Sequence, residues 1–564
     1  MKLSRPFAQL RTHWPLIIVG AVSAALLFTN LGSGYLWADE GDTAVLARNI
    51  AKFGFPRAWD GTTFMDSDFG ARENSDLVMV SSPWLQYYVT AASFALFGQN
   101  TFAARLPFAL IGCLTILLAY RLVCIATGDR RAALCATILM IGSVQFLLFC
   151  RQSRYYAIEM LLTCLLIDGF LQLRSMGRAL IFTVVAILLF HAHPIGIVPV
   201  IALGLLTLLD RDFSAHRRWY WLSVPAILAL TTPWFLLARA GYTENASLVS
   251  SARDFVLRLI QYLIECASVT PLIGVVVLVL LMSIFQRGAQ PLQERERSLL
   301  VTIATVIASL VVAMAVTQRS AALWVTGIRY ASAIIPIVAV LAGLLISRVS
   351  RGKLSILLPL IGIFAFTKFA QITPWFFWAD KSPDPEKKLV ALHVPINTID
   401  AFLPRENLLF ARDLFQKNVG TVGQSVEFLR QHAAPDDLVI TNYESEPLYF
   451  HTNLRQGMKI TIQDPIYDAA RRYGLPEYIF GVDHARWVVW RFNWDDYLGI
   501  HWPEVADHLL AEGGHITNVT ELKETGWENR ENIHFHRFSK DVYLFPQDTK
   551  LAAAIIFRVD WTSQ

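Results

Sequence analysis

The chain has 564 residues, of which 54% are hydrophobic and 17% are charged, and its formal net charge is +4. Soluble domains hold about 25% charged residues, so this composition excludes an ordinary soluble protein and predicts a membrane protein. The small, dispersed positive charge argues against nucleic acid as a partner. The six cysteines show no C-x-x-C spacing, and we expect them to be core residues without a disulfide framework or a metal site.

Eleven apolar runs are each interpreted as a transmembrane helix. The first, at 14–31, follows three basic residues and lacks the cleavage site of a signal peptide, so we expect it to be uncleaved. Connections on one side carry arginine clusters, which predicts a cytoplasmic amino terminus in the inner (plasma) membrane of the cell. The other runs lie at about 102–125, 132–150, 157–173, 179–193, 195–209, 219–238, 268–285, 298–316, 331–347 and 354–372.

The first outer loop, 36–101, is acidic, and Asp39, Glu40 and Asp42 stand in it directly after the first span. Apolar residues at helical spacing beyond Asp42 predict a short amphipathic helix on the membrane surface, and 82–97 predicts a second interfacial helix. A carboxylate at the amino end of a helix suits a general base. Alternatively, the acids only mark the outer side and cap the helix.

Composition changes after an aromatic cluster at 375–378, where a belt at the membrane surface is expected. The remaining chain has no cysteine and no long apolar run, and the odd number of spans places it outside the cell membrane. Predicted strands at 438–441 and 485–490 alternate with predicted helices at 423–432 and 502–511. The sequence thus predicts a polytopic α-helical membrane protein with two domains: a membrane domain, 1–378, and a soluble extracytoplasmic α/β domain, 379–564.

The turn between the third and fourth spans contains Arg151, Arg154, Tyr155 and Glu159. Polar groups at that depth are costly unless they pair or bind a ligand. They form either a structural Arg–Glu pair or a site for a phosphate or the sugar that it carries.

Two other outer turns carry phosphate-binding residue types. His191 and His193 lack a third ligand nearby for zinc, so we expect proton donors to a phosphate or structural histidines. Arg329, beside Tyr330, leads into the tenth span, and its guanidinium suits phosphate oxygens. The alternative for Arg329 is extension to the lipid headgroups.

A carboxylate base, cations for phosphate and helices at the outer leaflet suit transfer of a group from a phospholipid-like donor to an acceptor hydroxyl. The chain has no Walker motif and no G-x-G-x-x-G loop, which favours a lipid-linked donor over a nucleotide. A transporter or flippase of a lipid-linked saccharide is the competing interpretation. No cofactor is expected to be required, although the loop acids, with Asp66 and Asp68, are oxygen ligands that suit a divalent cation.

Three short motifs at these positions resemble the GT-C superfamily of integral-membrane glycosyltransferases, of the protein O-mannosyltransferase and lipid A aminoarabinose transferase type. They are Ala38-Asp39-Glu40 with Ala44 and Ala47-Arg48, then Arg154-Tyr155-Tyr156-Ala157, then Arg329-Tyr330 with Pro336, in a layout over roughly 10–375. The resemblance implies a polyprenyl-phosphate sugar donor, inverting transfer at the outer face, and an acceptor among the lipids, glycans or proteins of the cell envelope.

The resemblance also implies roles for individual residues. Asp39 would be the catalytic base and Glu40 its neighbour. Arg329, Arg154 and Arg151 would hold the donor phosphate. From the residues themselves we also expect Tyr330, His191 and His193 at the donor phosphate, and Asp42, Tyr155 and Glu159 at the acceptor.

Overall fold

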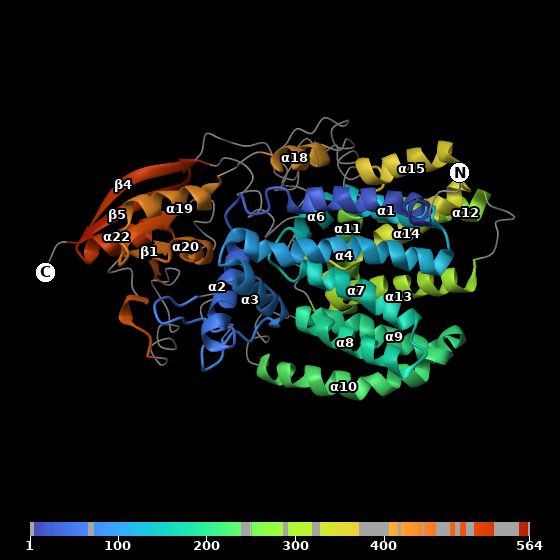
Figure 1. The fold of residues 1–564 in the computed structure, drawn as a ribbon. Helices are drawn as coiled ribbons and strands as arrows, with labels where there is room; N and C mark the ends of the chain where they lie inside the picture. The colour runs from blue at the N-terminus through green and yellow to red at the C-terminus, as the bar shows by residue number, and fades with distance from the viewer. Residues whose placement is uncertain are drawn as a thin grey trace.

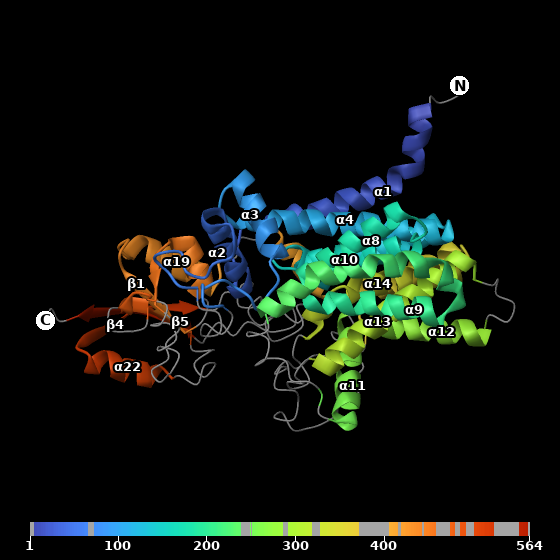
Figure 2. The same cartoon turned by 90° about the horizontal axis from the view of Figure 1, so that it is seen from below.

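The computed structural model describes residues 5–65, 73–238, 249, 251–285, 292–317, 327–371, 405–415, 419–442, 445–457, 474–479, 485–491, 501–523 and 552–561. These residues form a bundle of long helices and a small domain built on one sheet, which lie end to end (Figure 1). Helices α2 (Ala38–Phe53) and α3 (Leu85–Phe97) stand between the two parts in both views (Figure 2). The two helices predicted in the first outer loop are therefore confirmed as helices.

The bundle helices follow the predicted apolar runs, and local signals set their ends. In α4, the side chain of Asn100 accepts a hydrogen bond from the N–H of Ala103, and Gly128 ends the helix at φ 69°. Helix α4 packs against α5 and α7, and α14 packs against α5. The bundle elements are α1 (Arg5–Phe28), α4 (Thr101–Thr127), α5 (Arg130–Gly142), α6 (Val144–Cys150), α7 (Tyr156–Leu171), α8 (Met176–Ala192), α9 (Ile197–Leu209), α10 (Ser214–Ala238), α11 (Ala252–Val269), α12 (Leu272–Phe285), α13 (Glu294–Thr317), α14 (Ile334–Ser350) and α15 (Leu354–Phe366), with short 3₁₀ turns η1 (Pro194–Gly196), η2 (Arg211–Phe213) and η3 (Gly327–Ala331).

Within the described part of the chain, α4 and α13 are each long and apolar enough to cross a membrane. Three bent pairs pass the same test together: α5 with α6, bent by 72°, α9 with α10, bent by 106°, and α11 with α12, bent by 92°. Shorter apolar helices occur in α1, α8, α14 and α15. The chain is thus a multi-pass membrane protein, while the number of eleven spans stays a prediction.

The small domain is a five-stranded mixed sheet between helices. Its strand order is β2-β1-β3-β5-β4, with β1 parallel to β2 and β3, and β5 antiparallel to β3 and β4. Apolar residues on one face pack against α19 and those on the other face against α22. The elements are α19 (Thr421–His432), β1 (Leu438–Thr441), α20 (Ser445–Thr452), β2 (Arg455–Gln456), η4 (Glu477–Ile479), β3 (Ala485–Trp490), α22 (Trp502–Ala511), β4 (Gly514–Lys523) and β5 (Ala552–Trp561).

Both predicted strands and both predicted helices of this domain are confirmed, as β1, β3, α19 and α22. The sequence predicted neither β4 nor β5. Before them, α18 (Arg405–Asp413) packs on the bundle: Asn407 donates to the carbonyl of Gly142 at 3.0 Å, and Phe410 belongs to the bundle core. The predicted boundary at 378 and the aromatic cluster lie outside the described residues.

Helix α2, which the sequence predicted to be amphipathic and to lie on the membrane surface, is enclosed by other parts of the protein, and its position relative to the membrane stays a prediction. All residues from Asp39 to Ile50 are buried, because α3 and, from the small domain, α20 both pack against the helix. A Cβ added at Gly41 would lie 2.6 Å from the ring nitrogen of Pro447, and the guanidinium of Arg48 lies 4.4 Å from the ring centre of Tyr449. The small domain therefore closes over the helix that carries the acidic cluster.

Candidate active site

The amino end of α2 brings a carboxylate against two arginines from distant parts of the chain. Oδ2 of Asp39 lies 3.3 Å from Nη2 of Arg154 and 3.7 Å from Nη1 of Arg329. Arg154 comes from the turn between α6 and α7, and Arg329 comes from η3, just before α14. Each of these side chains is at most 17% exposed. We call these three residues the Asp39 cluster.

Arg154 is held on α2 by further hydrogen bonds. Its Nη1 donates to the backbone carbonyl of Asp39 at 3.1 Å and to Oγ1 of Thr43 at 3.4 Å. The turn itself is anchored on α3, because the N–H of Tyr155 donates to Oε1 of Gln86 at 3.0 Å. Arg154 is thus preorganised beside Asp39.

Glu40, expected as a catalytic neighbour, has another set of partners. Arg105 of α4 donates from Nε to Oε1 at 2.8 Å and from Nη2 to Oε2 at 2.5 Å, and the N–H of Ser153 donates to Oε1 at 2.8 Å. Glu40 is fully buried. Since both of its oxygens join α2 to α4 and to the turn of Arg154, the geometry favours a positioning role over proton transfer.

Three rings gather around Arg329. Tyr155 and His193 stack with centroids 4.7 Å apart, and His193 lies 5.4 Å from Tyr330. The Tyr155 hydroxyl donates to the Arg329 carbonyl at 3.4 Å, and Nη2 of Arg329 donates to the Tyr330 hydroxyl at 2.7 Å. The guanidinium also lies 4.8 Å from the centre of the Tyr330 ring. The structure therefore brings together His193, Arg329 and Tyr330, which the sequence assigned to the donor phosphate, and Tyr155, which it assigned to the acceptor; their roles stay predictions.

The two arginines remain cations despite their burial. Burial alone would lower the pKa of Arg154, but the carboxylate of Asp39 and the hydroxyl of Tyr156 outweigh it and raise that pKa above its usual value. The pKa of Arg329 is raised in the same way, against burial, by Tyr330, Tyr156 and Asp39. Two fixed cations face one carboxyl group, and this excess of positive charge suits a phosphate.

Two expected phosphate ligands have contacts elsewhere. Arg151 donates to three carbonyl oxygens at the carboxyl end of α1, each at 3.0 Å, and so caps that helix. Nε2 of His191 lies 3.2 Å from the carbonyl oxygen of Leu230 on α10. These contacts do not join either residue to the Asp39 cluster.

Glu159 and Asp42, the two residues expected to contact the acceptor besides Tyr155, are both buried. Glu159 on α7 accepts a hydrogen bond from Oγ of Ser332 at 2.5 Å. Because Ser332 follows Arg329 by three residues, this bond ties the Arg329 segment to α7. Asp42 lies on α2, one turn after Asp39, and is 8% exposed.

The sequence interpretation missed Arg105 and Gln86. Arg105 had a signal, since it is a charged residue near the start of the apolar run at 102–125, where a charge needs a partner. Gln86 had none, because its partner is a backbone N–H group whose position depends on the fold.

A metal site was left open by the sequence. Among the described residues, no group of three or more His, Cys, Asp or Glu side chains has a geometry that could hold a metal ion. Asp66 and Asp68 lie outside those residues, so a divalent cation stays untested.

Comparison with solved structures identifies the fold. The chain is similar to ArnT from Cupriavidus metallidurans bound to undecaprenyl phosphate, with a TM-score of 0.59, 17% identity, and coverage of 97% of this chain and 98% of that chain. The chain has the GT-C fold. ArnT from the same organism in the apo state gives a TM-score of 0.58 at 16% identity over the same shares of the two chains.

Comparison of the sequence with known protein families gives a match over part of the membrane domain. The family described as dolichyl-phosphate-mannose-protein mannosyltransferase matches residues 81–237, which include Arg154 but neither Asp39 nor Arg329. No curated protein matches the chain in a sequence search. The resemblance to the ArnT and protein mannosyltransferase type is thus confirmed.

Proposed function

We propose that this GT-C protein is a glycosyltransferase that moves a sugar from a polyprenyl-phosphate donor to a hydroxyl or phosphate of a cell-envelope lipid, glycan or protein. The observation that carries the proposal is the Asp39 cluster, in which a buried carboxylate lies 3.3 Å and 3.7 Å from two arginines. Such a cluster combines a proton acceptor with cations that bind phosphate. The similar ArnT structure holds undecaprenyl phosphate, which supports a donor of this class.

In the proposed reaction, Asp39 takes the proton of the acceptor O–H as that oxygen attacks the anomeric carbon of the sugar. A new C–O bond forms on the face opposite the donor phosphate, so the configuration inverts. The bond from the anomeric carbon to the bridging phosphate oxygen breaks, and polyprenyl phosphate leaves. Arg329 and Arg154 stabilise the charge that grows on the bridging oxygen.

The two arginines have different tasks in this scheme. Arg154 has two further hydrogen bonds to α2, so it orients Asp39. The contact of Arg329 with Asp39, at 3.7 Å, is too long for a hydrogen bond. A phosphate can therefore take up the Arg329 guanidinium without breaking a hydrogen bond to Asp39, and Arg329 becomes its principal ligand.

The residues around the cluster complete the proposal. Tyr155, His193 and Tyr330 form an aromatic wall beside Arg329, suited to the sugar and phosphate of the donor. Asp42 is proposed to contact the acceptor, and Glu159 to support the Arg329 segment through Ser332. The small domain, which covers α2, would guide the acceptor from the outer face of the inner membrane.

A transfer assay tests the donor side of the proposal. Purified protein in lipid nanodiscs is given a polyprenyl phosphate with a radiolabelled sugar, and an envelope extract supplies acceptors. Arg329→Gln should raise the donor KM about 10- to 100-fold, because a hydrogen bond to a charged group is worth about 1.5–3 kcal/mol. Asp76→Asn, an exposed carboxylate of the same loop, is the matched control and should leave KM unchanged.

The same assay separates the proposal from its competitor. Transfer that persists with a chelator would support metal-independent chemistry. If wild-type protein transfers no sugar but moves the labelled lipid between the leaflets of vesicles, the chain is a flippase and the transferase proposal fails.

A further inference from the structure

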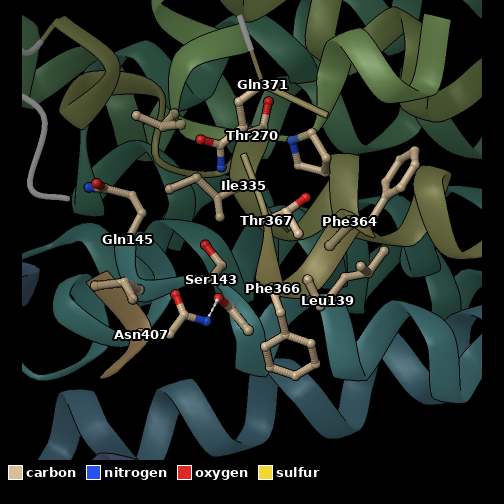
Figure 3. A pocket seen from close by; sticks show the side chains of 16 residues that line it. Leu139, Ser143, Gln145, Thr270, Ile335, Phe364, Phe366, Thr367, Gln371 and Asn407 are labelled. Carbon is tan, nitrogen blue, oxygen red and sulfur yellow. Dashed lines mark hydrogen bonds between the residues drawn. The ribbon is translucent and has the colours of Figure 1, made fainter. Parts of the chain in front are cut away.

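Two pockets among the described helices differ in the room that they offer a ligand. The pocket at the break between α5 and α6, shown in Figure 3 with Ser143 and Gln145, has a volume of about 30 Å³. That is room for about one water molecule. The other pocket lies between α12, α13 and α14 and has a volume of about 260 Å³, so it can take part of a larger molecule. We call it the α13 pocket.

The walls of the α13 pocket are apolar. Leu344 and Leu345 of α14 are buried and form its floor, whereas Val279 and Leu292 at its rim are 48% and 42% exposed. The pocket therefore opens at the side of the bundle, between α12 and the start of α13. In a multi-pass membrane protein, an exposed apolar rim of this kind faces lipid chains. The apolar lining residues are Val279, Met282, Leu292, Leu300, Leu344 and Leu345.

An ion pair forms the polar end of the pocket. Nη1 of Arg348 on α14 lies 2.6 Å from Oε2 of Glu296 on α13, and both residues line the pocket. The side chain of Glu296 is 8% exposed and that of Arg348 is 21% exposed, so the arginine is the partner that a ligand can reach. A guanidinium carries five N–H donors. Arg348 can therefore hold the Glu296 carboxylate and a phosphate oxygen at the same time.

The turn that follows α14 adds positive charge near this polar end. Arg351 and Lys353 lie in the turn, and both are exposed. Nη1 of Arg131, at the start of α5, donates to a backbone carbonyl of the same turn at 3.1 Å, which brings a third cation to it. In the first turn of α13, the charges of Glu294 and Arg295 cancel. The excess of positive charge suits an anionic lipid head group.

We propose that the α13 pocket binds one acyl chain of an anionic phospholipid, whose phosphate lies against Arg348. The chain fills the apolar space, and the cations of the turn after α14 compensate the charge of the head group. Both views place α12 at the end of the bundle away from the small domain (Figures 1 and 2). The lipid thus belongs to the leaflet opposite the Asp39 cluster, and its binding does not depend on sugar transfer.

Native mass spectrometry of the full-length protein in detergent micelles tests the proposal, with dioleoyl phosphatidylglycerol as the probe. One molecule should stay bound, and dioleoyl phosphatidylcholine, whose head group has no net charge, should bind about tenfold more weakly or less. Arg348→Gln should remove this preference, because glutamine cannot supply a charged donor to the phosphate. A photoreactive acyl chain on the phosphatidylglycerol should label peptides of α12, α13 or α14.

A second variant tests the apolar space without touching the ion pair, in case Arg348→Gln does not fold. Val279→Trp fills the pocket from its exposed rim and should weaken binding about tenfold or more, because the chain loses its apolar contacts. Leu280→Trp is the matched control, since Leu280 is the next residue of α12, is 54% exposed and is not part of the lining.

Three outcomes would overturn the proposal. Equal affinity for the two phospholipids would overturn the anionic head group. Equal binding by Val279→Trp and Leu280→Trp, or no binding by wild type, would overturn the pocket as the site. A polyprenyl phosphate that binds as tightly as phosphatidylglycerol and displaces it would assign the pocket to the tail of a sugar donor instead.

Discussion

Replacing Glu40 with glutamine tests whether this residue holds the site together. Glutamine keeps the shape of the side chain but removes the charge that faces Arg105, which binds it at 2.8 Å and 2.5 Å. Both side chains are at most 9% exposed, so the buried guanidinium would lose the carboxylate that faces it. Breaking a buried pair by removing one partner costs about 3–5 kcal/mol, and we expect a loss of unfolding free energy of this size.

The assay is unfolding of the purified protein in nanodiscs, followed by near-UV circular dichroism, with Asp76→Asn as the control. Arg105→Met should lower stability similarly, since it leaves the buried Glu40 carboxylate without its arginine and with only the N–H of Ser153 among the partners named above. A double Glu40→Gln, Arg105→Met variant should lose less than the sum of the two single losses, because no lone charge remains. A Glu40→Gln protein as stable as wild type but without transfer would refute this reasoning and return Glu40 to catalysis.

Two further predictions concern the contact between α2 and the small domain. Gly41→Ala should lower the free energy of unfolding by about 1–3 kcal/mol, because the new Cβ would lie 2.6 Å from Pro447. The control Gly177→Ala should not, because nothing lies within 4 Å of the added Cβ there. Equal unfolding midpoints for the two variants would contradict this prediction. Nε2 of His451 accepts from the N–H of Leu36 at 3.2 Å, and burial, with nearby arginines, lowers the pKa of His451 from 6.5 to about 3. Between pH 6.5 and 3 the unfolded chain binds more protons at His451 than the folded chain does. The contribution of His451 to the free energy of unfolding is therefore fully present above pH 6.5 and falls by about 1.4 kcal/mol per pH unit below it. The free energy of unfolding should differ less between pH 7.5 and pH 5.5 in His451→Gln than in wild type. An equal difference in the two proteins would contradict the assignment of this pH dependence to His451.

Local elements could be predicted from the sequence because their signals are local. Strand β1 and helix α22 were predicted with their observed bounds, since apolar runs and a proline at the helix start determine them. Strand β4 was missed because its sequence, Gly514–Lys523, alternates polar residues with few apolar ones at the sheet edge. The bend at Ser143 was missed because an apolar run does not reveal where its helix breaks.

The site was predicted in part. Asp39, Arg154 and Arg329 were chosen for their charge at the membrane edge, and the fold brings them together. The sequence placed Glu40 beside the base Asp39 but could not predict its pairing with Arg105 of α4, because the two residues are 65 positions apart in the chain. The contact of α2 with α20, where Pro447 lies against Gly41, joins distant parts of the chain, and no local pattern could predict it.

The most direct test of the central claim is the transfer rate of Asp39→Asn measured beside its affinity for the polyprenyl-phosphate donor. Asparagine keeps the size of the side chain but cannot take the proton from the hydroxyl of the sugar acceptor. The account predicts a rate lower by about 10²–10⁴-fold, the range for loss of a general base, with donor affinity within about tenfold of wild type. A variant that binds donor and transfers sugar at the wild-type rate would contradict the assignment of Asp39 as the base.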